Sequence, residues 1–169
     1  AGESMDRARG LLGSLATNEQ VRLAYRIDAY VDLAALEEKA GEADAARSAL
    51  RRAIALSPDA RQRVPLKRLL ARKLLRENNA AQALKLLEEC RAEAPDVETA
   101  TELQLDKAGA LLQAGRFAEA NDAYQIYLDV ANDPAGLADA HFGKGLALLE
   151  LGRHAEAAAA LDKAVNELQ

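Results

Sequence analysis

The feature that most constrains this chain is an internal repeat with a period of 37 residues. Segments that open on Gly41, Asn78, Gly115 and Gly152 align without gaps, and neighbouring opening residues are 37 positions apart. Four more columns keep this register: Ala34, Ala71, Ala108 and Gly145; Ala46, Ala83, Ala120 and Ala157; Leu50, Leu87, Tyr124 and Leu161; and Ala53, Cys90, Tyr127 and Ala164. A fixed period of this length indicates a stack of similar supersecondary units.

Each unit is predicted to be two helices joined by a tight turn. Gly and Asn end helices by adopting a left-handed backbone conformation, so the Gly41 column marks a turn. The Ala34 and Ala46 columns are always small, which lets neighbouring helices approach closely. Ala and Leu, both strong helix formers, make up about two-fifths of the 169 residues, and only 4% are aromatic. The composition therefore predicts an all-α protein without a sheet.

The columns resemble the motif of the tetratricopeptide repeat (TPR) family. That motif has a small residue in helix A, Gly at the turn, Ala early in helix B, a large apolar residue, a second small residue and a closing Pro. The first unit supplies Ala34, Gly41, Ala46, Leu50, Ala53 and Pro58, and the last supplies Gly145, Gly152, Ala157, Leu161 and Ala164. The resemblance covers residues 18–169 and implies a right-handed superhelical solenoid of antiparallel helix hairpins.

Two features depart from the family pattern. The aromatic residue expected early in helix A is present only as Tyr30, and the same column reads Lys67, Gln104 and His141 in the later units. The period is also longer than the usual length of about 34 residues. We assign the surplus to about one extra turn at the start of each helix A.

We expect residues 1–17 to form an N-terminal helix, either a partial repeat or a cap, and residues 18–169 to form four repeats. The repeats are placed at about 18–57, 58–95, 96–132 and 133–169, with helices at about 5–16, 19–40, 43–56, 59–77, 80–94, 97–114, 117–131, 134–151 and 154–168. Thr17 with Gln20 fits a capping box, and Asp96 and Asp133 fit N-caps. Pro65 requires that its helix either starts near Val64 or bends there.

No set of residues forms a recognisable catalytic or metal site, so we expect neither an enzyme nor a bound cofactor. His141 and His154 fall on different helices of the last unit, and Cys90 occupies a column of small residues. Gly10 and Gly13 lack the Lys and Ser/Thr of a phosphate-binding loop. The net charge of −5 disfavours a nucleic-acid binder, and the sequence has no apolar run long enough for membrane insertion.

The TPR resemblance implies a concave groove lined by particular positions of each helix A. In this sequence the groove residues predicted to bind a partner are Asp28, Val31, Asp32, Arg68, Arg72, Arg76, Leu105, Asp106, Phe142 and Leu146. The second helix A is unusual because it carries seven basic side chains between Arg61 and Arg76 and no acidic one. Two interpretations stay open: these arginines pair with acidic residues of adjacent helices, or they bind carboxylates of a partner. The first is favoured, and the two are compatible.

These observations favour a scaffold that binds a peptide or helix of a partner protein carrying acidic and apolar groups. We expect it to belong to a larger bacterial protein or assembly of the envelope, secretion or signalling, soluble in the cytoplasm or periplasm. The alternative is a regulatory or substrate-recruiting domain of an enzyme whose catalytic part lies outside this chain. Leu161, Val165 and Leu168 are expected to be partly uncovered on the last helix, which predicts a fragment of a longer array or self-association through that end.

Overall fold

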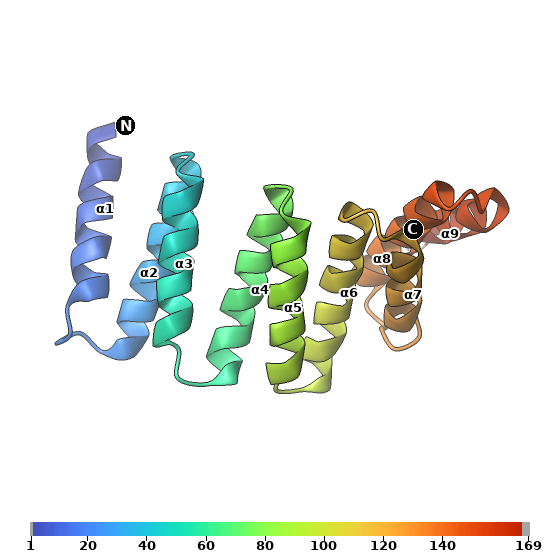
Figure 1. The fold of residues 1–169 in the computed structure, drawn as a ribbon. Coiled ribbons are helices and arrows are strands. Elements are labelled where there is room, and N and C mark those ends of the chain that lie inside the picture. Colours follow the sequence, from blue (N-terminus) through green and yellow to red (C-terminus); the bar gives the residue numbers. More distant parts are fainter. Residues whose placement is uncertain (1, 167–169) are drawn as a thin grey trace. The chain divides into compact units, whose positions relative to one another are not determined.

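The computed structural model describes residues 2–166 and shows a chain of consecutive helices (Figure 1). Within these residues the helices are α1 (Gly2–Thr17), α2 (Leu23–Lys39), α3 (Ala43–Leu56), α4 (Ala60–Arg76), α5 (Ala80–Glu93), α6 (Val97–Gln113), α7 (Phe117–Leu128), α8 (Pro134–Glu150) and α9 (His154–Asn166). None of the described residues lies in a strand, so the predicted all-α class is confirmed. The chain divides between Leu70 and Ala71, inside α4, into two compact units.

The 37-residue period of the sequence is also the period of the helices. The first helix of each pair begins at Leu23, Ala60, Val97 or Pro134, and each of these four helices is 17 residues long. We call them A helices and their partners α3, α5, α7 and α9 B helices. The B helices have 12–14 residues in the described range, so the A helices are longer by roughly one turn.

Each A helix is followed, just beyond its end, by the left-handed residue that the sequence predicts. Backbone φ is +82° at Gly41, +57° at Asn78, +73° at Gly115 and +74° at Gly152. After α2, the N–H of Gly41 donates to the Glu38 carbonyl at 3.0 Å, and the N–H of Glu42 donates to the Glu37 carbonyl at 2.9 Å. The same pair of bonds closes the other three A helices, which makes each turn a Schellman motif. The helix carbonyls are thus satisfied while the chain reverses.

Two predicted N-caps are present. Asp96 accepts a hydrogen bond from the Thr99 N–H at 2.8 Å, and Asp133 accepts one from the Gly136 N–H at 2.6 Å. Asp133 also accepts a hydrogen bond from the Tyr127 hydroxyl at 2.8 Å. The bonds from Tyr127 and Gly136 lower the pKa of the Asp133 carboxyl, while burial and the Asp133 carboxylate raise the pKa of Tyr127 to about 12. The start of α8 is therefore tied to the end of α7.

The start of the first repeat differs from the expectation. α1 begins at Gly2 rather than at position 5, and α2 begins at Leu23 rather than at about 19. The predicted capping box of Thr17 and Gln20 is wrong, because Thr17 is the last residue of α1 and its hydroxyl donates to the Gly13 carbonyl at 2.8 Å. The chain makes a turn between the two helices, and this turn occupies the positions that were expected to be helical.

Two further boundaries also change. α4 begins at Ala60, so a start near Val64 is wrong and Pro65 lies inside the helix. α7 ends at Leu128 rather than at about 131, because the residues that follow form the connection to the cap at Asp133. Positions 167 and 168 of the last expected helix, including Leu168, lie outside the described residues.

The small columns lie in the core. The Ala46 column is fully buried, and Ala34, Ala71 and Ala108 are buried in the A helices. Gly145 holds the last position of that column, and a Cβ added there would lie 2.7 Å from Leu161. Consecutive helices pack from α1 to α3 in the first unit and from α5 to α9 in the second. On α9, Val165 is exposed, in line with the expectation for that helix.

Candidate protein-binding surface

The predicted groove residues of the first unit lie on α2 and on the first half of α4. Asp28 and Val31 line a pocket of about 370 Å³. The other lining residues are Ala24, Ile27, Arg61, Gln62, Pro65 and Leu66. Asp32 is exposed one position beyond Val31, and Arg68 is half-buried and makes polar interactions. The sequence thus identifies two α2 residues that line this pocket. It did not predict that Arg61 and Gln62 also line it.

The pocket between α2 and α4 combines an apolar floor with a polar edge. Ile27, Val31 and Leu66 supply apolar side chains, whereas Asp28 and Arg61 supply one charge of each sign. Pro65 has no N–H, so it cannot donate the usual helix bond to the carbonyl four residues earlier, which belongs to Arg61. A side chain that enters this pocket therefore meets apolar atoms beside one acidic and one basic residue.

In the second unit an ion pair joins two A helices. The Nε and Nη2 atoms of Arg72, on α4, both lie 2.9 Å from Oδ1 of Asp106, on α6. The Arg72 side chain is 53% exposed, whereas the Asp106 side chain is only 8% exposed. The favoured interpretation of the arginine stripe, pairing with an acidic neighbour, is therefore confirmed for this pair. The exposed guanidinium still presents part of its surface to solvent.

The remaining predicted residues of the second unit supply apolar surface and one more charge. Leu105 and Leu146 are half-buried, and Phe142 is 53% exposed, which is unusual for a large aromatic ring. Phe142 and Leu146 lie one turn apart on α8, and α8 packs against α6, which carries Leu105. Arg76 is exposed at the end of α4 and makes polar interactions. The structure thus places apolar and charged groups on neighbouring A helices.

The side chain of Tyr124 packs against the backbone of α8 next to Phe142, and the sequence did not predict this contact. A Cβ added at Gly143 would lie only 2.3 Å from the Tyr124 ring and hydroxyl, so the ring rests directly on the backbone of α8. Burial, with a smaller contribution from Asp139, raises the pKa of Tyr124 to about 12. A signal was present in the sequence, because Tyr124 is the aromatic member of a leucine column and Gly143 follows Phe142 directly.

The titratable side chains of residues 2–166 form no metal-binding group. No group of three or more His, Cys, Asp or Glu side chains in that range could hold a metal ion. Cys90 is buried and takes part in no disulfide, His154 is exposed and His141 is half-buried. Across the same residues, every helix is too short or too polar to cross a membrane.

The comparisons with known proteins agree with the geometry. A sequence profile of the tetratricopeptide repeat family matches residues 68–136 and 105–168, and a second profile of that family matches residues 27–60. These matches cover most of the chain, which therefore belongs to the tetratricopeptide repeat family. Membership supports a protein–protein interaction scaffold, and such repeats are typically non-catalytic. A comparison with curated proteins finds no match.

Several solved structures share the fold. MamA AMB-1 has a TM-score of 0.71 and 22% identity, over 98% of this chain and 90% of that one. BtubC from P. vanneervenii has a TM-score of 0.77 and 16% identity, over 95% and 70% of the two chains. A Podosopora anserina putative kinesin light chain with nearly identical TPR-like repeats has a TM-score of 0.74 and 16% identity, over 99% and 86%. At these identities the likeness establishes the fold alone.

Proposed function

We propose that this protein is a scaffold that binds a peptide or helix of a partner protein on the exposed face of its A helices. The ligand combines a carboxylate with a bulky apolar group. The scaffold works within a larger bacterial protein or assembly, of the kind found in the envelope, in secretion or in signalling. Family membership supports the general role, and the charges and exposed apolar groups of the A helices support the ligand chemistry.

The observation that carries the proposal is the half-exposed ion pair of Arg72 and Asp106. The guanidinium contacts the single oxygen Oδ1 of Asp106 through both Nε and Nη2. Asp106 is nearly buried, so it fixes the direction of the arginine without covering it. Guanidinium groups bind carboxylates through paired N–H donors. Arg72 is thus held in place to bind a second carboxylate, from a ligand, on its Nη1 side.

Apolar surface for the ligand is present in both units. In the second unit the exposed Phe142 ring and the half-buried Leu146 lie on α8. In the first unit the pocket beside Val31 and Leu66 accepts one apolar side chain. Aromatic and arginine side chains are enriched among the energetically important positions of protein interfaces. Within the second unit alone, the guanidinium of Arg72 and the ring of Phe142 suit a peptide that carries both acidic and apolar residues.

The experiment begins with peptides selected by display on the wild-type chain, and their affinities are measured by isothermal titration. Arg72→Glu should weaken a selected acidic–apolar peptide by about tenfold or more, and Phe142→Ala by a similar factor, because both groups are expected to contact it. Lys85→Glu, an exposed charge reversal on the B helix α5, is the matched control and should leave the affinity unchanged. Circular dichroism confirms that each variant is folded.

The opposite pattern would refute this surface. If Lys85→Glu abolishes binding while Arg72→Glu and Phe142→Ala bind as well as the wild type, the B-helix face is the binding site. The affinity should also fall as salt is raised, because screening weakens contacts between partly exposed charges. An affinity that is independent of salt would exclude the carboxylate part of the proposal.

A further inference from the structure

A second hollow lies in the second unit, between α7, α8 and α9. Its volume is about 520 Å³. The floor is apolar and includes Leu137, Leu148 and Ala160, while the rim includes His141, Lys144 and Lys163. His141, Lys144 and Leu148 are spaced by three and four residues on α8, which puts them on the face opposite to Phe142 and Leu146. This hollow is therefore separate from the surface described above.

The first hairpin, α2–α3, has a smaller hollow at the equivalent positions, because its own side chains fill most of the space. Three repeats earlier, the positions of His141, Lys144, Leu148 and Lys163 are occupied by Tyr30, Leu33, Glu37 and Arg52. These four residues line a hollow of about 170 Å³. Tyr30 is buried, and the guanidinium carbon of Arg52 lies 5.9 Å from the centre of its ring, a cation–π contact.

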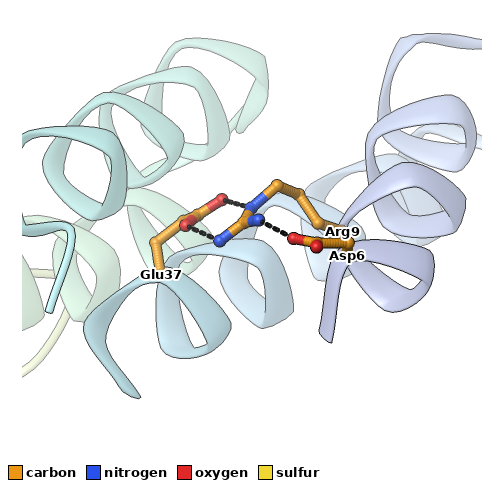
Figure 2. A network of polar contacts seen from close by, with 3 residues as sticks. All are labelled: Asp6, Arg9 and Glu37. Atoms are coloured by element: carbon orange, nitrogen blue, oxygen red, sulfur yellow. Dashed lines mark hydrogen bonds and ion pairs between the residues drawn. The ribbon is translucent and has the colours of Figure 1, made fainter. Parts of the chain in front are cut away.

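Glu37 of the filled hollow is tied to the preceding helix. Nε and Nη2 of Arg9, on α1, donate to the two Glu37 carboxylate oxygens at 2.6 and 2.9 Å, and Nη1 donates to Asp6 (Figure 2). In the last hairpin Leu148 replaces Glu37 and the smaller imidazole of His141 replaces the phenol ring of Tyr30, so neither the phenol ring nor the ion pair is present there. The last hairpin keeps only the apolar floor of the hollow and, above it, a cationic side chain from the B helix.

The open hollow has an excess of positive charge at its rim. Lys144 donates to the neutral side chain of Gln125, and Lys163 adds a second ammonium group. The carboxylate on the rim, Glu156, is held by Arg153 through bonds of 2.8 and 2.6 Å, and the hydrogen bond from Arg153 lowers the pKa of Glu156. Because Glu156 is already paired with an arginine, the two lysines favour an anionic ligand.

We propose that the hollow between α7, α8 and α9 binds an aromatic side chain of a partner peptide that is flanked by carboxylates. The ring takes the place that Tyr30 fills in the first hairpin, with Lys163 in the position of Arg52. The neighbouring carboxylates meet Lys144 and Lys163. The last repeat thus receives from a partner the aromatic residue that the first repeat supplies itself.

The experiment uses the whole chain and three capped peptides as probes: acetyl-Asp-Phe-Asp-amide, acetyl-Asp-Ala-Asp-amide and acetyl-Asn-Phe-Asn-amide. Titrations are followed in ¹H–¹⁵N correlation spectra. The first peptide should shift the amide signals of Leu137, His141, Lys144 and Ala160, and should bind about tenfold more tightly than either of the other two. Equal shifts with the Ala peptide would overturn the aromatic part, and equal shifts with the Asn peptide would overturn the ionic part.

Variants then locate the site. His141→Tyr should fill the hollow as Tyr30 does and abolish binding, while His154→Tyr, on the exposed histidine of the same hairpin, should not change it. Lys163→Gln should weaken binding about fivefold. Because Lys163 lies at the surface, this substitution does not require the core to repack. Arg72→Glu should have no effect, so this site and the proposed surface around Arg72 and Phe142 can fail independently. Undiminished binding to both His141→Tyr and Lys163→Gln would refute the proposal.

Discussion

The hairpins α2–α3 and α8–α9 share one sequence pattern but use it differently. In both, a left-handed glycine closes the A helix and small residues lie at the helix contacts. The first hairpin fills its hollow with Tyr30 and Arg52, and buries Glu37 against Arg9. The last hairpin has no such ring or ion pair and leaves a larger hollow. The turn glycine and the small size of the contact residues are thus common to both hairpins, while the residues that line the hollow differ.

The exposed faces of the two A helices differ in the same way. α2 presents Asp28 and Asp32, whereas α8 presents Phe142 and places Gly143 at the position of Asp32. The glycine is required because the Tyr124 ring occupies the space where a side chain would stand. The two A helices therefore present different side chains at equivalent positions of the repeat, acidic on α2 and apolar on α8.

The largest expected effect follows from the glycines of the second unit. Gly143→Ala should lower the free energy of unfolding by about 1–3 kcal/mol, because the new Cβ displaces the buried Tyr124 ring. Gly109→Ala is the matched control on α6. Its Cβ would lie 3.8 Å from the Tyr124 hydroxyl, an ordinary contact, so the change should raise stability by about 0.5–1 kcal/mol. Urea unfolding measures both, and a shift in the same direction would contradict the packing described.

A smaller effect is expected from the ion pair that distinguishes the first hairpin. Arg9→Ala should lower the Tm by a few degrees, because it leaves the buried Glu37 carboxylate without its main donor. Adding Glu37→Leu, which imports the residue of the last hairpin at Leu148, should recover most of that loss. Calorimetry on the two variants tests this. If the double variant is less stable than Arg9→Ala alone, the two hairpins do not share the same core geometry.

The smallest effect is a pH dependence confined to the link between α7 and α8. The folded-state pKa of Asp133 is below its ordinary value of 3.8, so its contribution to stability is present above that value and is lost as the pH falls further. The pKa of Tyr127 rises from 10.0 to about 12, so its contribution is present below pH 10.0 and is lost as the pH rises towards 12.

Urea midpoints measured across the pH range test both halves of this link. Asp133→Asn should reduce the acid loss, and Tyr127→Phe should reduce the alkaline loss. Tyr127→Phe also removes one hydrogen bond to Asp133, so it should weaken the acid dependence as well. An alkaline profile that is identical in the wild type and Tyr127→Phe would show that this hydroxyl does not titrate with unfolding.

Much of the fold follows from local rules that act within one repeat. A left-handed turn admits Gly or Asn, so Gly41, Asn78, Gly115 and Gly152 mark the ends of the A helices in the sequence alone. A side chain at a close helix contact must be small, so the Ala46 column predicts burial. The capping box at Thr17 failed because several polar residues there can start a turn as well as a helix.

The sequence by itself determined the period, the helix class, the turns and the small-residue contacts, because each depends on the backbone conformation and side-chain size of a few neighbouring residues. Only the tertiary structure decided that Arg72 pairs with Asp106, that Tyr124 rests on Gly143 and that the hollow beside His141 is open. These features join side chains from different helices. Long polar and aromatic side chains reach several alternative partners, so the contact that forms depends on how closely the helices pack.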